Sequence, residues 1–296
     1  MSPAEGMQAE PGVHAVDYES LKNWVGRSEQ AKDIAVAAPL AGLAATLDYK
    51  VPPWTAGEVP PLGHWLYCLP RAQQSELAED GHPKRGGFLP PVPLPRRMWA
   101  GGRFTFDSPL RIGERLERKS TITEVKYKTG RSGALVFVTV LHELSTASGK
   151  ALTEVQDIVY REAPPPGEPA IRQTASAPSC KADWTRTIVP DPTQLFRFSA
   201  LTFNAHRIHY DRQYCQQVEG YPGLVVHGPL TATLLMDLFL RHHPGVRVKS
   251  FAFRGQRPLF DIYPFTVCGA EQTDGAELWA LDHEGQAAMT AELQVL

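Results

Sequence analysis

PLTATLLMDLFL, residues 229–240, is a helix-length run that is apolar on nearly every face. A helix of this kind needs a curved sheet to wrap around it. Four strand-like segments follow it along the chain, VRVKSFAFR, YPFTVCGA, AELWALD and AAMTAELQVL. The pattern predicts an α+β domain in which an antiparallel sheet rolls around a central helix running from about Pro229 to Arg241.

The first half of the chain repeats this order of elements. A helix-like pattern begins near Tyr18, and IAVAAPLAGLAATL, residues 34–47, has the small apolar residues of a buried helix. Residues 114–128, 134–145 and 151–162 then alternate β-branched and polar residues, separated by the turn signals TGRSG and TASGK. We therefore expect an antiparallel meander here and a second copy of the same domain, inferred from element order because no residue-level repeat is visible.

Composition changes divide the chain. Residues 1–13 are expected to be a loose tail, and residues 163–183 are rich in Pro, Ala and Ser, as in a linker. This division predicts an N-terminal domain at 14–162 and a C-terminal domain at 184–296. In the second domain we expect a strand around residues 194–198 and a helix within 211–218, ahead of the long helix.

The segment at residues 80–102, DGHPKRGGFLPPVPLPRRMWAGG, is too rich in proline for a helix or an inner strand. Long loops without regular structure are often lids or binding loops. Two interpretations stay open, a solvated surface loop and a lid whose Arg85, Arg96 and Arg97 contact an anionic substrate.

Composition also excludes several classes of protein. The 296 residues include 30 Lys and Arg against 32 Asp and Glu, a net charge of −2, which gives no field to gather nucleic acid or an anionic membrane. No apolar run is long and continuous enough to span a bilayer. The four cysteines lack CxxC spacing, which argues against a disulfide framework and a zinc ribbon. With an acidic N-terminus unlike a secretory signal, we expect a bacterial cytoplasm, or a mitochondrial matrix for a processed form.

Polar and titratable residues are concentrated in two stretches, FSALTFNAHRIHYD, residues 198–211, and YPGLVVHGPL, residues 221–230. Asn204, His206, Arg207, His209 and Asp211 fall within eight positions beside the start of the apolar helix. Three interpretations compete. The spacing HxxH is weak evidence for a metal, and histidines also satisfy buried backbone groups. A proton-transfer site without metal or cofactor is favoured, because histidine exchanges protons near neutral pH.

These two stretches resemble the motif of the MaoC-like enoyl-CoA hydratases and hydroxyacyl-thioester dehydratases of the hotdog fold. The resemblance implies that His209 is the catalytic histidine and that the backbone N–H of Gly228 faces the thioester oxygen. Asn204 stands where the family has its catalytic Asp, and His206 where the following Asn stands. Because an amide cannot act as a base, this is a departure from the family pattern.

A narrower resemblance rests on NAHRIHYD together with TLD, GHWLYCLP, WVGR and the proline-rich segment. The chain is similar to the two-hotdog mesaconyl-C4-CoA and itaconyl-CoA hydratases and to the type 2 hydroxyacyl-thioester dehydratases. The resemblance implies a double hotdog, with a catalytic C-terminal domain and an N-terminal domain that has lost the motif. Two hotdogs in one chain would pair their sheet edges internally, and a homo-oligomer stays open.

The resemblance also implies a mechanism. His209 would be the main base that deprotonates the water, Asn204 would hold that water through its carbonyl oxygen, and Asp211 would set the histidine tautomer. Gly228 would stabilise charge on the thioester oxygen. For a free substrate carboxylate the candidates are Arg207 first, then Arg254, then Arg96 and Arg97, with His206 nearby. His227 is expected to be structural, and Lys84, Arg85 or Arg257 would contact the CoA nucleotide.

The function that this resemblance implies is reversible hydration of a branched C5 dicarboxylyl-CoA, itaconyl-CoA or mesaconyl-C4-CoA, to citramalyl-CoA. The abundance of arginine favours this substrate over a long acyl chain, which needs an apolar tunnel. The alternatives are dehydration of 3-hydroxyacyl thioesters on CoA or acyl carrier protein, and an acyl-thioester binder without catalysis. A thioesterase is a weaker option, since no nucleophile elbow is present.

Overall fold

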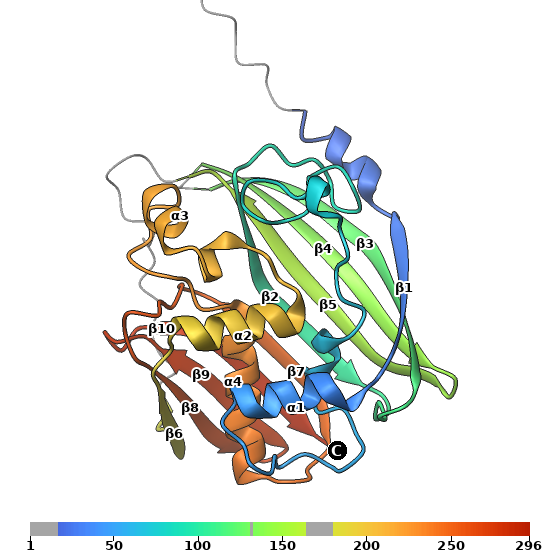
Figure 1. Ribbon diagram of the computed structural model, residues 1–296, viewed down its shortest axis with the longest axis vertical. Helices are drawn as coiled ribbons and strands as arrows, with labels where there is room; N and C mark the ends of the chain where they lie inside the picture. The colour runs from blue at the N-terminus through green and yellow to red at the C-terminus, as the bar shows by residue number, and fades with distance from the viewer. Residues whose placement is uncertain (1–16, 131–132, 164–179) are drawn as a thin grey trace, which may run out of the picture.

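The computed structural model describes residues 17–130, 133–163 and 180–296 (Figure 1). Its ten strands form one antiparallel sheet in the order β1-β3-β4-β5-β2-β7-β10-β9-β8-β6. The bounds are β1 Ser28–Ile34, β2 Arg96–Phe106, β3 Arg115–Gly130, β4 Gly133–Thr146, β5 Gly149–Arg161, β6 Trp184–Ile188, β7 Val248–Gly255, β8 Phe265–Gln272, β9 Gly275–Leu281 and β10 Ala287–Val295. The expected tail lies outside the described residues, as does most of the expected linker.

The helices are few and mostly short. They are α1 Ala37–Thr46, α2 Pro192–Thr202, α3 Arg212–Gln217 and α4 Gly228–His242, with the 3-10 turns η1 Ser20–Trp24, η2 Gly63–Leu66, η3 Gln74–Glu76 and η4 Arg207–His209. No helix in the described ranges has the length and apolarity needed to cross a bilayer.

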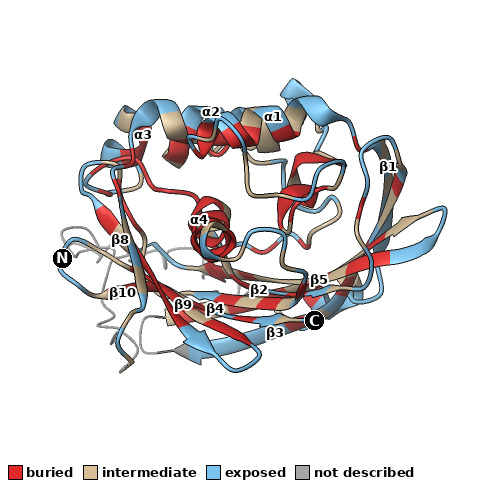
Figure 2. Cartoon of the chain, turned by 90° about the horizontal axis from the view of Figure 1, so that it is seen from below, coloured by how far each residue is buried: buried red, intermediate tan, exposed pale blue. Residues whose placement is uncertain are grey.

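Helix α4 lies at the centre of the C-terminal half, with the sheet curving around it (Figure 2). Every residue from Leu230 to Leu240 is buried, and the helix packs against β6, β8, β9 and β10. Its one acidic residue, Asp237, accepts hydrogen bonds from Arg186 at 2.6 Å and Tyr49 at 2.6 Å, so the carboxylate is paired where the helix is apolar. The predicted α+β fold, a sheet wrapped around a helix, is confirmed.

The two halves of the sheet join through β2 and β7, which pair with Gly102 opposite Phe253. A Cβ at Gly101 would stand 2.6 Å from the carbonyl oxygen of Phe253, so glycine is needed for this close approach. The expectation of internal pairing between the halves is confirmed. The exclusion of an inner strand from residues 80–102 is wrong at its end, because β2 begins at Arg96, directly after the last proline of that segment.

Helix α2 corrects a second expectation, the strand around residues 194–198. Asp191 accepts a hydrogen bond from the backbone N–H of Gln194 at 2.8 Å, and Pro192 occupies the first helical position. This N-terminal signal, with the helix-forming Leu195, prevails over the β propensity of Phe196 and Phe198. Gly42 of α1 allows the two helices to approach, since a Cβ there would stand 2.7 Å from Leu201.

The N-terminal half differs from the C-terminal half in what covers its strands. Helix α1 packs against α2 and η2, and the pattern near Tyr18 forms only the turn η1. The segment between α1 and β2 has little regular structure, but it contributes buried side chains. Leu62 and Leu66 join the main core, and Val92 and Leu94 pack on β3, β4 and β5. A long irregular segment therefore takes the place of a long central helix in this half.

Candidate active site

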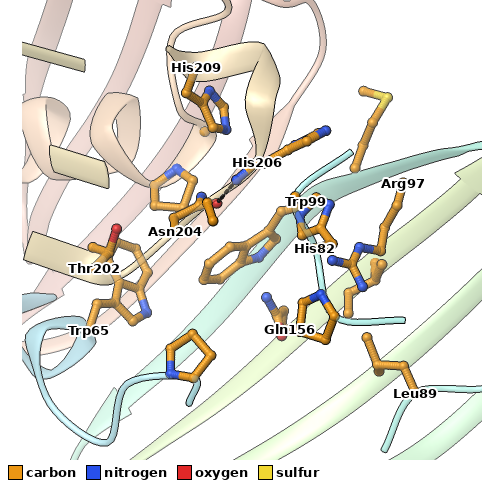
Figure 3. Close-up of a pocket in the computed structure, with 18 of the residues that line it drawn as sticks. Trp65, His82, Leu89, Arg97, Trp99, Gln156, Thr202, Asn204, His206 and His209 are labelled. Carbon is orange, nitrogen blue, oxygen red and sulfur yellow. Dashed lines mark hydrogen bonds between the residues drawn. The ribbon is translucent and has the colours of Figure 1, made fainter. Parts of the chain in front are cut away.

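A cavity of about 2020 Å³ lies between the two halves and is lined by both of them (Figure 3). Asn204, His206 and His209, from the segment after α2, line it together with Arg97 and Trp99 of β2. Trp65 and Trp99 form an aromatic wall, with ring centroids 5.2 Å apart. The motif residues and the end of the proline-rich segment, far apart in sequence, thus share one cavity.

Helix α2 ends by placing Asn204 and His206 at the cavity. Phe203 takes a left-handed conformation, and the backbone N–H of Asn204 donates to the carbonyl of Ser199 at 2.9 Å. The side-chain Oδ1 of Asn204 then accepts the backbone N–H of His206 at 3.0 Å. Because this oxygen, expected to hold water, already serves the turn, the NH₂ group is what Asn204 chiefly offers to a ligand.

His209 is buried, with 7% of its surface exposed, and its ring has a fixed tautomer. Nδ1 lies 2.7 Å from the carbonyl oxygen of Val225, and since a carbonyl only accepts, Nδ1 carries the proton and Nε2 has a free lone pair. Burial lowers the pKa of His209 to about 4. The hydrogen bond to Val225 raises this pKa, but its effect is smaller than that of burial. His209 is therefore a neutral hydrogen-bond acceptor at neutral pH.

His227 and Gly228 form the start of α4. His227 is fully buried, stacks on His209 with centroids 3.6 Å apart and has Nε2 2.8 Å from the Ser199 hydroxyl. Burial lowers its pKa well below the usual value, and these contacts fit the expected structural role. Gly228, which lines the cavity, is the first residue of the helix, so its backbone N–H has no acceptor within α4 and can meet a partial negative charge.

The sequence analysis missed Asp80 and His82, which the fold brings beside the motif. His82 lines the cavity, its Nδ1 lies 3.1 Å from Asp80 Oδ2, and its ring centroid lies 4.0 Å from that of His206. Burial, followed by the Arg97 charge, lowers the pKa of His82 to about 4. The Asp80 carboxylate raises this pKa, but its effect is smaller. Burial raises the pKa of Asp80, but hydrogen bonds from His82 outweigh this effect and hold it below its usual value.

Asp80, His82 and His206 are also the one group within the described ranges whose ligand atoms are close enough to share a metal ion, all within 4.8 Å. Asp80 and His82 already satisfy each other through a hydrogen bond. Burial, and next the neighbouring His82, lower the pKa of His206, so this ring too is neutral. The donor set of one carboxylate and two imidazoles is compatible with a metal, but every donor also has a place in the hydrogen-bonded or stacked arrangement.

Two of the arginines expected to bind substrate have other partners. Arg207 pairs with Asp211 at 2.7 Å and lies over the Tyr214 ring, and it does not line the cavity. Arg96 pairs with Glu219 and donates to its carbonyl oxygen at 2.7 Å. The structure therefore does not bring Arg207 or Arg96 into the cavity, because a neighbouring carboxylate binds each guanidinium.

Asp211 does not set the His209 tautomer either, because Val225 does. Asp211 instead pairs with Arg207 and accepts the backbone N–H of Tyr214 at 3.0 Å, which caps α3. Arg97 and Arg254 do line the cavity. Arg97 lies beside the hydroxyl group of Tyr160, which is neutral, and no ion pair with a carboxylate is found for it across the described ranges, so its charge is not balanced by an acidic side chain.

Three residues were expected at the CoA nucleotide, and all three, Lys84, Arg85 and Arg257, line the cavity. Each of them also makes a hydrogen bond or ion pair within the protein. Arg85 donates to the carbonyls of Val92, Leu94 and Pro95, and so fixes the proline-rich segment. Lys84 donates to the carbonyl of Ser75 at 2.9 Å, and Arg257 pairs with Asp282 at 3.4 Å.

A buried polar network in the first half also reaches the cavity. Glu154, 4% exposed, lies 3.0 Å from His64 Nε2 and accepts the indole N–H of Trp65 at 3.3 Å. Burial raises the pKa of Glu154, but the hydrogen bond from His64 and the charge of the neighbouring His142 outweigh burial. The pKa of Glu154 is therefore below its usual value. The network fixes Trp65, and with it one wall of the cavity.

A continuous antiparallel sheet around a central helix, with buried histidines at a cavity between two halves, is the architecture of a double-hotdog protein. The profile of the family "Hydroxyacyl-thioester dehydratase type 2" matches residues 62–261. The chain belongs to this family and is a hydro-lyase.

Individual proteins agree with this assignment. The chain is 50% identical to mesaconyl-C(4)-CoA hydratase of Chloroflexus aurantiacus, over 92% of this chain and 96% of that protein. It is 27% identical to the mitochondrial hydroxyacyl-thioester dehydratase type 2 of Schizosaccharomyces pombe, over 81% and 89% of the two chains. The fold is that of a MaoC-like dehydratase from Phytophthora capsici, with a TM-score of 0.66, 16% identity and coverage of 95% and 99%.

Proposed function

We propose that this protein catalyses the reversible addition of water to a branched C5 dicarboxylyl-CoA, mesaconyl-C4-CoA or itaconyl-CoA, to form citramalyl-CoA. The observation that carries the proposal is the 50% identity to a mesaconyl-C(4)-CoA hydratase along almost the whole of both chains. The cavity offers neutral histidines, a helix N–H without an acceptor in α4, and Arg97, which has no carboxylate partner among the described residues; these are the groups that such a substrate needs.

His209 and Asn204 hold the reacting water in this proposal. The lone pair on His209 Nε2 accepts a hydrogen bond from the water, and the NH₂ group of Asn204 donates one to its oxygen. The two contacts direct the remaining lone pair of the water at the β carbon. Gly228 N–H stabilises the negative charge that then develops on the thioester oxygen, a contact typically worth about 3 kcal/mol of barrier.

Arg97 is the residue that we assign to the free carboxylate of the substrate. It lines the cavity close enough to His82 for its charge to lower the pKa of that histidine. A guanidinium binds a carboxylate through two parallel hydrogen bonds. Arg254, which is exposed on β7, stands second. A straight-chain acyl group has no charge to offer Arg97, so this residue separates the two substrate classes.

The two halves would divide the work. We propose an N-terminal domain at 14–162 that has lost the motif and a catalytic C-terminal domain at 184–296. Asn204, His209 and Gly228 all belong to the second, whereas Arg97 and Trp99 reach the site from the first through β2. We also propose that CoA enters between Lys84 and Arg257 and that the protein works in a bacterial cytoplasm, as the bacterial source of its 50% identical relative suggests.

A second candidate function is dehydration of 3-hydroxyacyl thioesters for fatty-acid synthesis, favoured by the family profile and the yeast relatives. The test is hydration of purified mesaconyl-C4-CoA and itaconyl-CoA, followed by loss of the conjugated thioester absorbance, beside a straight-chain 2-enoyl-CoA. We expect rapid turnover of a dicarboxylyl thioester. A preference for the straight chain supports the second candidate, and binding without turnover would reduce the protein to an acyl-thioester binder.

A further inference from the structure

Three histidines of the site, His82, His209 and His227, have a hydrogen-bond partner on the ring, and one of these partners differs from the others in its charge. His209 faces the Val225 carbonyl and His227 faces the Ser199 hydroxyl. His82 faces a carboxylate, Asp80 Oδ2, at 3.1 Å. Of the three, His82 is the one whose protonated ring would form beside a negative charge that is already in contact with it.

The loop that carries this pair is fixed against the motif segment. The backbone N–H of Arg207 donates to the carbonyl of Asp80 at 2.9 Å, and Asp80 Oδ1 accepts the backbone N–H of His82 at 2.9 Å. Gly81 has φ +87°, and a Cβ there would stand 1.9 Å from the carbonyl oxygen of Ala205. Asp80 is thus held at both of its oxygens, and His82 Nε2 is left for the cavity that the ring lines.

The chemistry of the site requires a proton carrier that the motif does not supply. Asn204 cannot exchange a proton, because it is an amide. His209 was expected to be the main base, but a proton on its Nε2 would create a buried cation with a carbonyl, and no carboxylate, at its other nitrogen. The same proton on His82 would be balanced by Asp80.

We propose that His82, positioned by Asp80, carries the proton between the water and the α carbon of the thioester, while His209 and Asn204 hold the water. This inference rests on the proposed function, since it assigns a step of that reaction. In hydration, the water oxygen bonds to the β carbon, the double bond shifts to lie between the α carbon and the carbonyl carbon, and the carbonyl electron pair moves to the thioester oxygen. His82 Nε2 takes one proton of the water and delivers it to the α carbon as the carbonyl bond re-forms, so that one water is added and nothing else is consumed.

The groups around His82 connect this step to the substrate. Asp80 and Arg85 face it from its own loop, Arg97 from β2, and His206 from the segment after α2. Arg97 opposes a positive charge on His82. A substrate carboxylate bound at Arg97 neutralises the positive charge of Arg97. Binding of the dicarboxylate would therefore make protonation of His82 easier than it is in the free enzyme.

The test compares His82→Gln and Asp80→Asn with His242→Gln, a control at the far end of α4 whose ring stacks on Trp184. Each variant is assayed with the thioester that the wild type turns over, for kcat and for exchange of the α hydrogen with D₂O. We expect His82→Gln to lose both by about 100-fold or more, the usual contribution of general acid-base catalysis. Added imidazole should restore part of the activity of His82→Ala.

Asp80→Asn separates a positioning role from a structural one. Without the carboxylate, the protonated form of His82 is less stable. The fall of kcat on the acid side of its pH profile should therefore move to lower pH, and kcat should fall about 10-fold to 100-fold. His242→Gln should match the wild type in both measurements.

Two results would overturn the proposal while leaving the hydratase function in place. The first is a His82→Gln protein that folds and keeps kcat and α-hydrogen exchange within threefold of the wild type, while His209→Gln is silent. The second is loss of wild-type activity after chelation and its recovery with Zn²⁺ alone, which would make Asp80, His82 and His206 a metal centre. Wild-type protein that hydrates only straight-chain thioesters would instead overturn the proposed substrate and leave the role of His82 measurable.

Discussion

Nδ1 of His209 donates its proton to the carbonyl oxygen of Val225 at 2.7 Å, and this one contact fixes which ring nitrogen faces the cavity. Val225 lies two residues before His227, in the segment that leads into α4. The start of the central helix therefore positions both the Gly228 N–H and the histidine that meets the substrate's water.

Replacing His209 by Gln should lower kcat for water addition by about 100-fold or more, because an amide does not reproduce the ring geometry that bonds the Val225 carbonyl through one nitrogen and presents an acceptor to the water at the other. Gln keeps a polar group of similar reach, so the melting temperature should stay close to that of the wild type. Steady-state kinetics and thermal unfolding of the two proteins make the comparison. Unchanged kcat would remove His209 from the mechanism.

Replacing Arg97 by Met should lower kcat/KM for the dicarboxylyl thioester by about 10-fold to 100-fold, the value of a lost charged hydrogen bond. Turnover of a straight-chain thioester should change little. Arg207→Met is the matched control, since Arg207 pairs with Asp211 outside the cavity. Equal losses in the two variants would show that Arg97 has no special contact with the substrate carboxylate.

Gly81→Ala should destabilise the fold by about 2 kcal/mol or more and should also lower turnover. The residue has φ +87°, and the new Cβ would collide with the carbonyl oxygen of Ala205. Gly26→Ala is the control, because Gly26 has the same φ of +87° with nothing within 4 Å of its Cβ position. Urea unfolding of both variants separates the collision from the backbone strain, and equal free energies would argue against tight packing of the Asp80 loop.

Acid should destabilise the protein between about pH 6.5 and pH 4. Burial lowers the folded-state pKa of His209 to about 4, from an ordinary value of 6.5, so the unfolded chain binds more protons in this window. Stability from this group is therefore present above pH 6.5 and is lost as the pH falls, by at most about 1.4 kcal/mol per pH unit. Urea unfolding from pH 4 to pH 7 measures the slope, which should decrease in His209→Gln.

The sequence was sufficient for most of the fold because its signals are local. The apolar run of α4 and the alternation in β3, β4 and β5 appear where they were expected. Strand β1 was not anticipated, since SEQAKDI is a largely exposed edge strand with little apolar alternation. Strand β6 is another short edge, and in α2 the cap at Asp191 outweighed aromatic residues typical of a strand.

The site was predictable only where its residues are close in sequence. His209 and Gly228 belong to one motif, and both line the cavity. Arg207 lies outside the cavity, and the spacing of Asp211, four residues on, is a signal for the ion pair that holds it there. Asp80 and His82 lie more than 120 residues before Asn204, and their place beside His206 depends on a loop packed by tertiary contacts, which spacing alone does not encode.

The substrate of the wild-type protein follows from one ratio, kcat/KM for citramalyl-CoA over kcat/KM for a straight-chain 3-hydroxyacyl-CoA, with both measured as water loss. We expect the dicarboxylate to be preferred by at least about 10-fold, because only that substrate gains a charged contact with Arg97. A ratio below one would contradict this expectation and would assign the protein to straight-chain 3-hydroxyacyl thioesters.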